Sequence, residues 1–120
     1  MKEAIIRIVS GDDVILAESA QRFKKAWKSG KPGPAVFTFS SPAQLFSVIS
    51  PKRWELIERL QQLGPSTIRG LARALERDVK RVHDDVMAMI EWGIVARDTN
   101  GHVLVPFDVI HAAFDLKAAA

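Results

Sequence analysis

The sequence predicts an α+β fold, and three stretches of its 120 residues carry this prediction. Residues 66–92 contain two apolar runs at helical spacing, separated by only three residues, and therefore predict two helices joined by a tight turn. Residues 94–105 hold two short apolar segments around an Asn-Gly pair, which favours a β-hairpin because both residue types tolerate positive φ. Residues 4–40 predict strand, helix and strand. We therefore expect a C-terminal winged helix-turn-helix with an N-terminal β-α-β extension.

The β-α-β extension is predicted over residues 1–41. Residues 4–9 and 35–40 are short, apolar and rich in β-branched or aromatic side chains, so both predict strands. An amphipathic helix between them should end near Lys28, before a Gly- and Pro-rich loop. If the strands are parallel neighbours, the crossover should be right-handed. Two strands are marginal in water, so the unit needs either the rest of the chain or a second subunit as a partner. We favour a homodimer, and binding of a partner protein by residues 1–41 stays open as the alternative.

The second predicted domain spans residues 42–120 and begins with two helices. Pro42 opens the first and Pro51 opens the second, because proline suits the first helical position. A continuous apolar stripe over residues 52–63 predicts that the second of these helices packs against the helix-turn-helix. Gly64 and the proline after it should end this helix.

The helix-turn-helix is predicted from two apolar faces and the cap between them. The apolar face of its first helix consists of Ile68, Leu71, Ala72 and Leu75. The second helix, about residues 78–92, should bury Val79, Val82, Val86 and Ile90. Asp78 is a suitable N-cap because its carboxylate can accept a hydrogen bond from a first-turn N–H. A wing over residues 94–105 and a short C-terminal helix over residues 108–116 should follow.

Residues 48–110 resemble a small prokaryotic family of winged helix-turn-helix DNA-binding proteins that are distantly related to the MarR-like and ArsR-like regulators. The most specific matching pieces are Pro51-Lys52-Arg53, the segment Arg77–Val86 and the segment Gly101–Pro106. The resemblance implies a transcriptional repressor. Because members also resemble antitoxins, it implies as an alternative a protein that neutralises a partner toxin and regulates its own operon. Glu76 departs from the glycine usual in the turn, so either the turn differs or Glu76 needs a partner such as Arg73 or Lys80.

The expected DNA interface centres on the N-terminal end of the second helix, which would reach base edges in the major groove. Lys80 and Arg81 can pair with guanine, and Asp84 can accept from cytosine N4 or orient an arginine. Ser66 and Thr67 offer hydroxyl and free N–H groups to a phosphate. Further candidate contacts to phosphates or bases are Lys52, Arg53, Arg69, Arg73, Arg77, Arg97, Asn100 and His102. A homodimer would place two such helices on successive half-sites.

Some of these side chains also have purely structural interpretations. Asp85 is expected to pair with a basic helix residue such as Arg81, or with the wing, rather than to contact DNA. His83 is expected to pack at the rim of the apolar face rather than to read a base. Surface ion pairs are equally consistent with the sequence for Arg73 with Glu76 and for Arg97 with Asp98.

Composition and motifs indicate a soluble binding protein rather than an enzyme. Hydrophobic residues make up 48% of the chain and charged residues 26%, and the net charge of +3 is too small to indicate a polyanionic partner by itself. The chain has no cysteine, and its three histidines match no metal-ligand spacing. Gly-rich phosphate loops and nucleophile elbows are absent from the sequence. We expect no enzyme activity, metal, cofactor, membrane span or signal peptide, and a cytoplasmic location, with double-stranded DNA, a second copy and possibly a toxin as partners.

Overall fold

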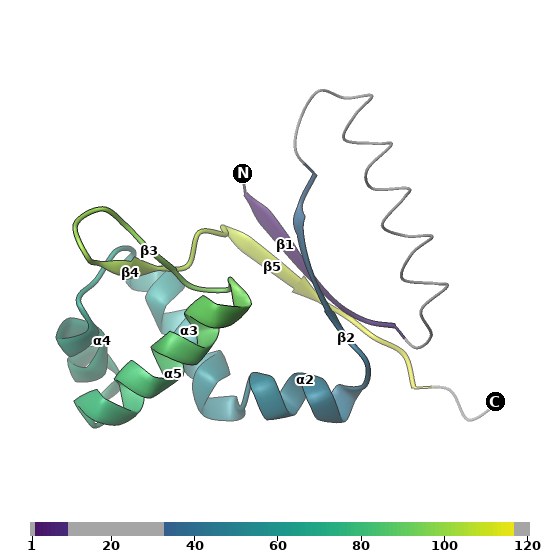
Figure 1. Ribbon diagram of the computed structural model, residues 1–120, viewed down its shortest axis with the longest axis horizontal. Helices are drawn as coiled ribbons and strands as arrows, with labels where there is room; N and C mark the ends of the chain where they lie inside the picture. The colour runs from purple at the N-terminus through teal and green to yellow at the C-terminus, as the bar shows by residue number, and fades with distance from the viewer. Residues whose placement is uncertain (1, 10–32, 117–120) are drawn as a thin grey trace. The chain divides into compact units, whose positions relative to one another are not determined.

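The computed structural model describes residues 2–9 and 33–116, whose helices and strands form a small α+β fold (Figure 1). The chain divides into two compact units, which we describe separately. The first unit contains Met1–Val48 and Val109–Ala120, and the second contains Ile49–Asp108. The predicted N-terminal helix and its crossover lie outside the described residues. In the described part of the chain, no helix is long and apolar enough to cross a membrane.

The first unit contains a parallel sheet of three strands in the order β2-β1-β5. Its central strand β1 (Glu3–Ile8) pairs with β2 (Ala35–Phe39), in a register that runs from Ala4 opposite Ala35 to Ile8 opposite Phe39. The two N-terminal strands are therefore parallel neighbours, as a β-α-β unit requires.

The third strand corrects the prediction of a helix over residues 108–116. Strand β5 (Val109–Ala112) pairs in parallel with β1, from Glu3 opposite Val109 to Ile6 opposite Ala112. A helical spacing that spans only two turns is weak evidence, because short helices are marginal without tertiary packing. The second edge of β1 offers unpaired backbone N–H and C=O groups, and the β-branched pair at the start of β5 suits a strand. The C-terminal part of the same chain thus supplies a third strand.

Helix α2 (Pro42–Val48) contacts β2 and belongs to this first unit, whereas the sequence groups residues from 42 onward with the C-terminal domain. Leu45 is the buried residue of the helix. The rings of Phe46 and Phe114 meet edge to face, with centroids 6.4 Å apart. Among the described residues of this unit, the buried side chains are Ala4, Ile6, Val9, Phe39 and Leu45.

The second unit contains α3 (Pro51–Leu63), α4 (Ile68–Leu75), α5 (Val79–Trp92) and a hairpin of β3 (Ala96–Arg97) and β4 (Val103–Leu104). These elements confirm the three predicted helices and the predicted hairpin. Helix α4 contacts both α3 and α5. The core of the unit is apolar and consists of Ile49, Leu56, Ile57, Leu60, Leu71, Ala72, Val82, Val86, Met89, Ile94, Val95 and Val103.

The ends of α5 follow the predicted local signals. The Asp78 carboxylate accepts a hydrogen bond from Arg81 N at 3.2 Å, which confirms the predicted N-cap. Gly93 ends the helix in the left-handed conformation with φ of 87°. Two of the four apolar assignments are not met: Val79 is 43% exposed and Ile90 is only half-buried, whereas Met89 is a buried residue that sequence periodicity does not select. The first turn of α5 extends beyond the apolar core, so other side chains do not cover Val79.

The turn between α4 and α5 has a backbone conformation that favours glycine at position 76. Glu76 adopts the left-handed conformation, with φ of 54° and ψ of 46°, as the C-cap of α4. Residues with a Cβ enter this region at a cost in energy that glycine avoids. Among the described residues, Glu76 forms no ion pair with Arg73 or Lys80, so no side-chain partner compensates for this conformation.

The hairpin turns through Asp98, which organises the loop with its side chain. Asp98 Oδ1 accepts hydrogen bonds from the backbone N of Asn100 and of His102, each at 2.9 Å. Asp98 N donates to His102 O at 2.9 Å and thereby closes the loop. Of the Asn-Gly pair, only Gly101 takes positive φ, at 82°. The loop therefore has three residues between Asp98 and His102, a common hairpin length in which glycine holds the left-handed position.

Candidate nucleic-acid interface

Four basic side chains of α4 and α5 are exposed, and we call them the exposed basic group. This group consists of Arg69, Arg73, Lys80 and Arg81. Within the described part of the chain, none of these side chains forms an ion pair or a hydrogen bond. The buried face of α5 carries Val82, Val86 and Met89, so Lys80 and Arg81 stand on the part of the first turn that the core leaves uncovered. Their charges are available to an external anion.

The start of α4 is more constrained than the sequence predicts. Thr67 Oγ1 accepts a hydrogen bond from Gly70 N at 3.0 Å and caps the helix. Ser66 Oγ donates to Gly64 O at 2.8 Å. The backbone N and O of Ser66 form hydrogen bonds with Val103 O and N at 3.0 and 2.8 Å. The expectation of a free N–H and hydroxyl at Ser66 is therefore wrong, because this residue joins the hairpin to the start of α4.

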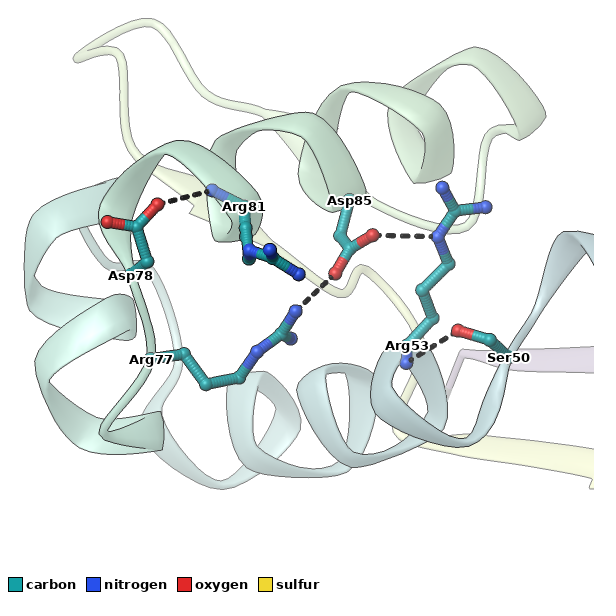
Figure 2. A network of polar contacts seen from close by, with 6 residues as sticks. All are labelled: Ser50, Arg53, Arg77, Asp78, Arg81 and Asp85. Carbon is teal, nitrogen blue, oxygen red and sulfur yellow. Dashed lines mark hydrogen bonds and ion pairs between the residues drawn. The ribbon is translucent and has the colours of Figure 1, made fainter.

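Arg53, Arg77 and Asp85 form an ion-pair cluster, which we call the Asp85 cluster (Figure 2). Arg53 Nε donates to Asp85 Oδ1 at 3.0 Å, and Arg77 Nη2 donates to Asp85 Oδ2 at 2.7 Å. The side chains of Arg53, Arg77 and Asp85 are 24%, 13% and 17% exposed. Asp85 thus pairs with basic residues as expected, but its partners are Arg53 and Arg77 rather than Arg81. Both arginines, which the sequence offers as DNA contacts, have an intramolecular partner.

The electrostatics of the cluster keep Asp85 ionised. Burial raises the pKa of the Asp85 carboxyl, but hydrogen bonds and charge interactions with Arg77 and Arg53 together outweigh burial and hold that pKa below its ordinary value. Arg77 Nη1 is buried and has no hydrogen-bond partner within the described part of the chain. The cluster therefore consists of one anion between two partly buried cations.

The hairpin places one basic side chain beside α5. Arg97 Nη2 lies 3.8 Å from the Sδ atom of Met87 in α5, and its side chain is exposed. Arg97 forms no ion pair with Asp98 among the described residues. Asp98 Oδ1 instead accepts two backbone hydrogen bonds of the loop, and Asp98 Oδ2 lies 3.8 Å from His102 Nδ1. Asn100 is exposed at the tip of the hairpin. The hairpin residues Arg97 and Asn100 are accordingly open to solvent.

The other predicted residues occupy separate positions. Lys52 is exposed in the first turn of α3, and Asp84 is exposed on α5. His83 is also exposed, with its Nδ1 atom 3.4 Å from Asp84 Oδ1, so the expectation that it packs at the rim of the core is wrong. The three histidines lie in separate pairs, as His83 with Asp84, His102 with Asp98 and His111 with Glu3. The described residues contain no group of three side chains placed to hold a metal ion.

One structural feature that the sequence does not indicate is the link between α3 and α5. The pair of Arg53 and Asp85 joins residues 32 positions apart, and no local pattern indicates such a contact. One signal was present: Asp85 follows Val82 by three residues and precedes Met89 by four. Both neighbours are buried, so the spacing places the carboxylate at the edge of the buried face.

The comparisons with known proteins bear on the second unit most directly. No curated protein and no solved structure matches the chain. The sequence model of the HVO_A0114 family matches residues 48–112, which is more than half of the chain. The matched range includes α3, α4, α5, the hairpin and β5, and therefore both the exposed basic group and the Asp85 cluster. The chain belongs to the HVO_A0114 family.

Proposed function

We propose that residues 49–108 form a winged helix-turn-helix that binds double-stranded DNA with sequence specificity and represses transcription. The observation that carries the proposal is the pair Lys80 and Arg81, exposed and without an intramolecular partner among the described residues, at the start of the helix that follows a short turn. The first turn of a recognition helix is the part that reaches base edges. Arginine and lysine in that turn suit the O6 and N7 atoms of guanine.

The surrounding residues support this arrangement. Arg69 and Arg73 on α4 supply further cations for phosphates, which fix the register of a protein on DNA without reading its sequence. Arg97 lies beside α5, so the wing adds a cation next to the proposed reading helix. The residues that we propose to contact DNA are Lys52, Thr67, Arg69, Arg73, Lys80, Arg81, Asp84, Arg97, Asn100 and His102. We no longer propose Arg53, Arg77 and Ser66 as contacts, because intramolecular bonds occupy them.

We also propose that the protein acts as a homodimer. A dimer with two recognition helices would bind a palindromic site whose half-sites are about one helical turn apart. Analytical ultracentrifugation of the full chain, with and without DNA, tests this part of the proposal. A monomer that binds a single half-site would contradict it.

The central test is a salt titration of binding to the DNA upstream of the protein's own gene, beside a scrambled duplex of equal length. Affinity for both duplexes should fall steeply with salt, with tighter binding to the native one, because phosphate contacts release counterions while base contacts select the sequence. Equal weak binding to both would contradict specific recognition. The absence of binding would exclude the proposal for this DNA.

A matched pair of variants tests whether α5 is the recognition helix. Arg81→Ala should weaken binding to the native duplex by about 1–3 kcal/mol and leave the fold intact. Arg59→Ala removes the same charge from an exposed site on α3, outside the proposed interface, where Arg59 only bonds Gln62. It should change the affinity for both duplexes equally. If Arg81→Ala and Arg59→Ala change the affinities for the two duplexes in the same way, α5 is not the recognition helix.

A second candidate function, antitoxin activity through protein binding, has one supporting observation in the first unit. Phe46, Phe114 and Leu116 are 48%, 39% and 79% exposed, and exposed apolar side chains that gather in one region often mark a protein contact. Co-expression with the product of the neighbouring gene should then give a stable complex that Phe46→Ser weakens. Deletion of residues 1–40 is not a suitable test, because it would remove two of the three strands of the sheet. A complex unaffected by Phe46→Ser would exclude this surface.

A further inference from the structure

We infer that Asp85 is a positioning residue for the proposed DNA site, which holds α5 in the rotation that aims Arg81 at the bases. The inference rests on the proposed function and goes beyond it, because Asp85 itself would touch no DNA. It explains how a basic surface that would attract any DNA can prefer one DNA sequence.

Residues from three segments of the second unit meet at the carboxylate of Asp85 (Figure 2). Arg53 comes from the first turn of α3, where its backbone N donates to the cap Ser50, so its own position is anchored. Arg77 comes from the turn after α4, immediately before the cap Asp78. Asp85 binds both arginines from the second turn of α5. The carboxylate therefore connects α3, the turn and α5.

The same carboxylate sets the direction of Arg81. Arg81 precedes Asp85 by four residues, so the two side chains leave the helix on nearly the same side, one turn apart. A rotation of α5 that moves Asp85 away from its arginines would turn Arg81 by a similar angle. The buried side chains Val82, Val86 and Met89 determine which face of α5 points into the core, but small rotations within that packing change little apolar area. Two charge-assisted hydrogen bonds have defined directions and fix the rotation.

The cluster also removes two cations from the surface that meets DNA. Arg77 lies directly before the proposed recognition helix and Arg53 beside its second turn, and guanidinium groups released from Asp85 there would attract any phosphate backbone. Asp85 neutralises one of the two positive charges and holds both guanidinium groups within the cluster. Asp85 thus favours specific binding by orienting Arg81 and lowers non-specific binding by occupying two arginines.

The test compares Asp85→Asn with Glu55→Gln in the full chain. Both variants remove one negative charge, but Glu55 is exposed on α3 and lies outside the cluster. Affinities for the native upstream duplex and the scrambled duplex are measured at one salt concentration. Asp85→Asn should lower the ratio of the two affinities by about tenfold, the effect of misdirecting one good base contact. Glu55→Gln should leave the ratio unchanged. An unchanged ratio in Asp85→Asn would overturn the inference and leave the proposed function standing.

A second variant covers the case in which Asp85→Asn does not fold. Arg53→Lys keeps the charge of the surface but cannot reproduce the directed Nε hydrogen bond of arginine. It should lower the affinity ratio by a smaller factor, with little change in binding to the scrambled duplex. A full native ratio in Arg53→Lys, together with full helix content by circular dichroism, would overturn the inference.

A measurement without DNA separates this inference from the proposed function. The chain has no cysteine, so spin labels at Glu58→Cys on α3 and Glu91→Cys on α5 would be unique. Asp85→Asn should shift or broaden the distance distribution between them, whereas Glu55→Gln should not. If the wild-type chain shows no preference for the native duplex, the proposed function fails on that result alone. An unchanged distance distribution in Asp85→Asn would then overturn the positioning role as well.

Discussion

The exposed basic group and the Asp85 cluster contain side chains of the same chemical type with opposite environments. Arg81 is exposed and has no partner within the described residues, whereas Arg77, only four positions earlier, is 13% exposed and bonded to Asp85. Arg81 is the nearer of the two to Asp85 in sequence, but Arg77 lies in the turn before α5 and is free of helical geometry. The difference shows that a run of basic residues does not by itself define a DNA surface. A partly buried acid decides which arginines are bonded within the protein and which stay available to the proposed DNA partner.

The largest expected effect comes from removing the acid of the cluster. Asp85→Ala leaves two partly buried guanidinium groups without their anion and should destabilise the protein by about 2–3 kcal/mol. Asp84→Ala, the exposed neighbour, should stay within about 0.5 kcal/mol. Urea unfolding followed by circular dichroism gives both values. Equal changes in the free energy of unfolding in the two variants would contradict a stabilising role of the Asp85 cluster.

The two arginines four residues apart provide the next test. Arg77→Met should lower the free energy of unfolding by about 1–2 kcal/mol, because Asp85 loses its shorter hydrogen bond. Arg81→Met should change it by less than about 0.5 kcal/mol, since the side chain has no partner to lose. A double-mutant cycle of Arg77→Met with Asp85→Asn should show coupling, and a cycle with Arg81→Met should show none. Coupling between Arg81 and Asp85 would contradict the observed pairing.

The pH dependence of stability tests whether Asp85 stabilises the protein as an ionised carboxylate. The pKa of Asp85 is lower in the folded protein than in the unfolded chain, so its contribution to stability is complete above the unfolded value of about 4. That contribution is lost as pH falls through the lowered folded pKa, because the carboxylate becomes protonated. The stability difference between the wild type and Asp85→Asn should therefore be constant from about pH 5 to 8 and shrink at lower pH. A difference that does not change down to the most acidic pH measured would contradict ionic pairing.

The smallest expected effect lies in the turn that carries Arg77. Glu76→Gly should raise the free energy of unfolding by about 0.5–1 kcal/mol, because glycine relieves the left-handed strain but loses more entropy on folding. Glu55→Gly, in the interior of α3, should instead destabilise by about 1 kcal/mol. Thermal unfolding of both variants measures the difference. A destabilising Glu76→Gly would show that the Glu76 side chain has a role of its own.

The local parts of the fold and of the site were predictable because their causes are local. Ser50 and Pro51 mark the start of α3, Asp78 caps α5 and Gly93 ends it, and each acts through hydrogen bonds or dihedral preferences within a few residues. The hairpin follows from the Asn-Gly pair for the same reason, although only its glycine takes positive φ. The exposure of Lys80 and Arg81 follows from the apolar periodicity of α5, which leaves their side of the helix uncovered.

The sequence by itself determined the helices of the second unit, their caps, the hairpin and the basic character of the first turn of α5. The tertiary structure decided three further points: that Val109–Ala112 is a strand, that Ser66 joins the hairpin to α4, and that Asp85 holds Arg53 and Arg77. Each of these depends on groups that are distant in sequence, such as β1 with the C-terminal segment or α3 with α5. The backbone groups at a strand edge and a partly buried carboxylate form hydrogen bonds with whichever groups the fold brings within bonding distance. The spacing of residues along the chain does not reveal which distant groups come that close.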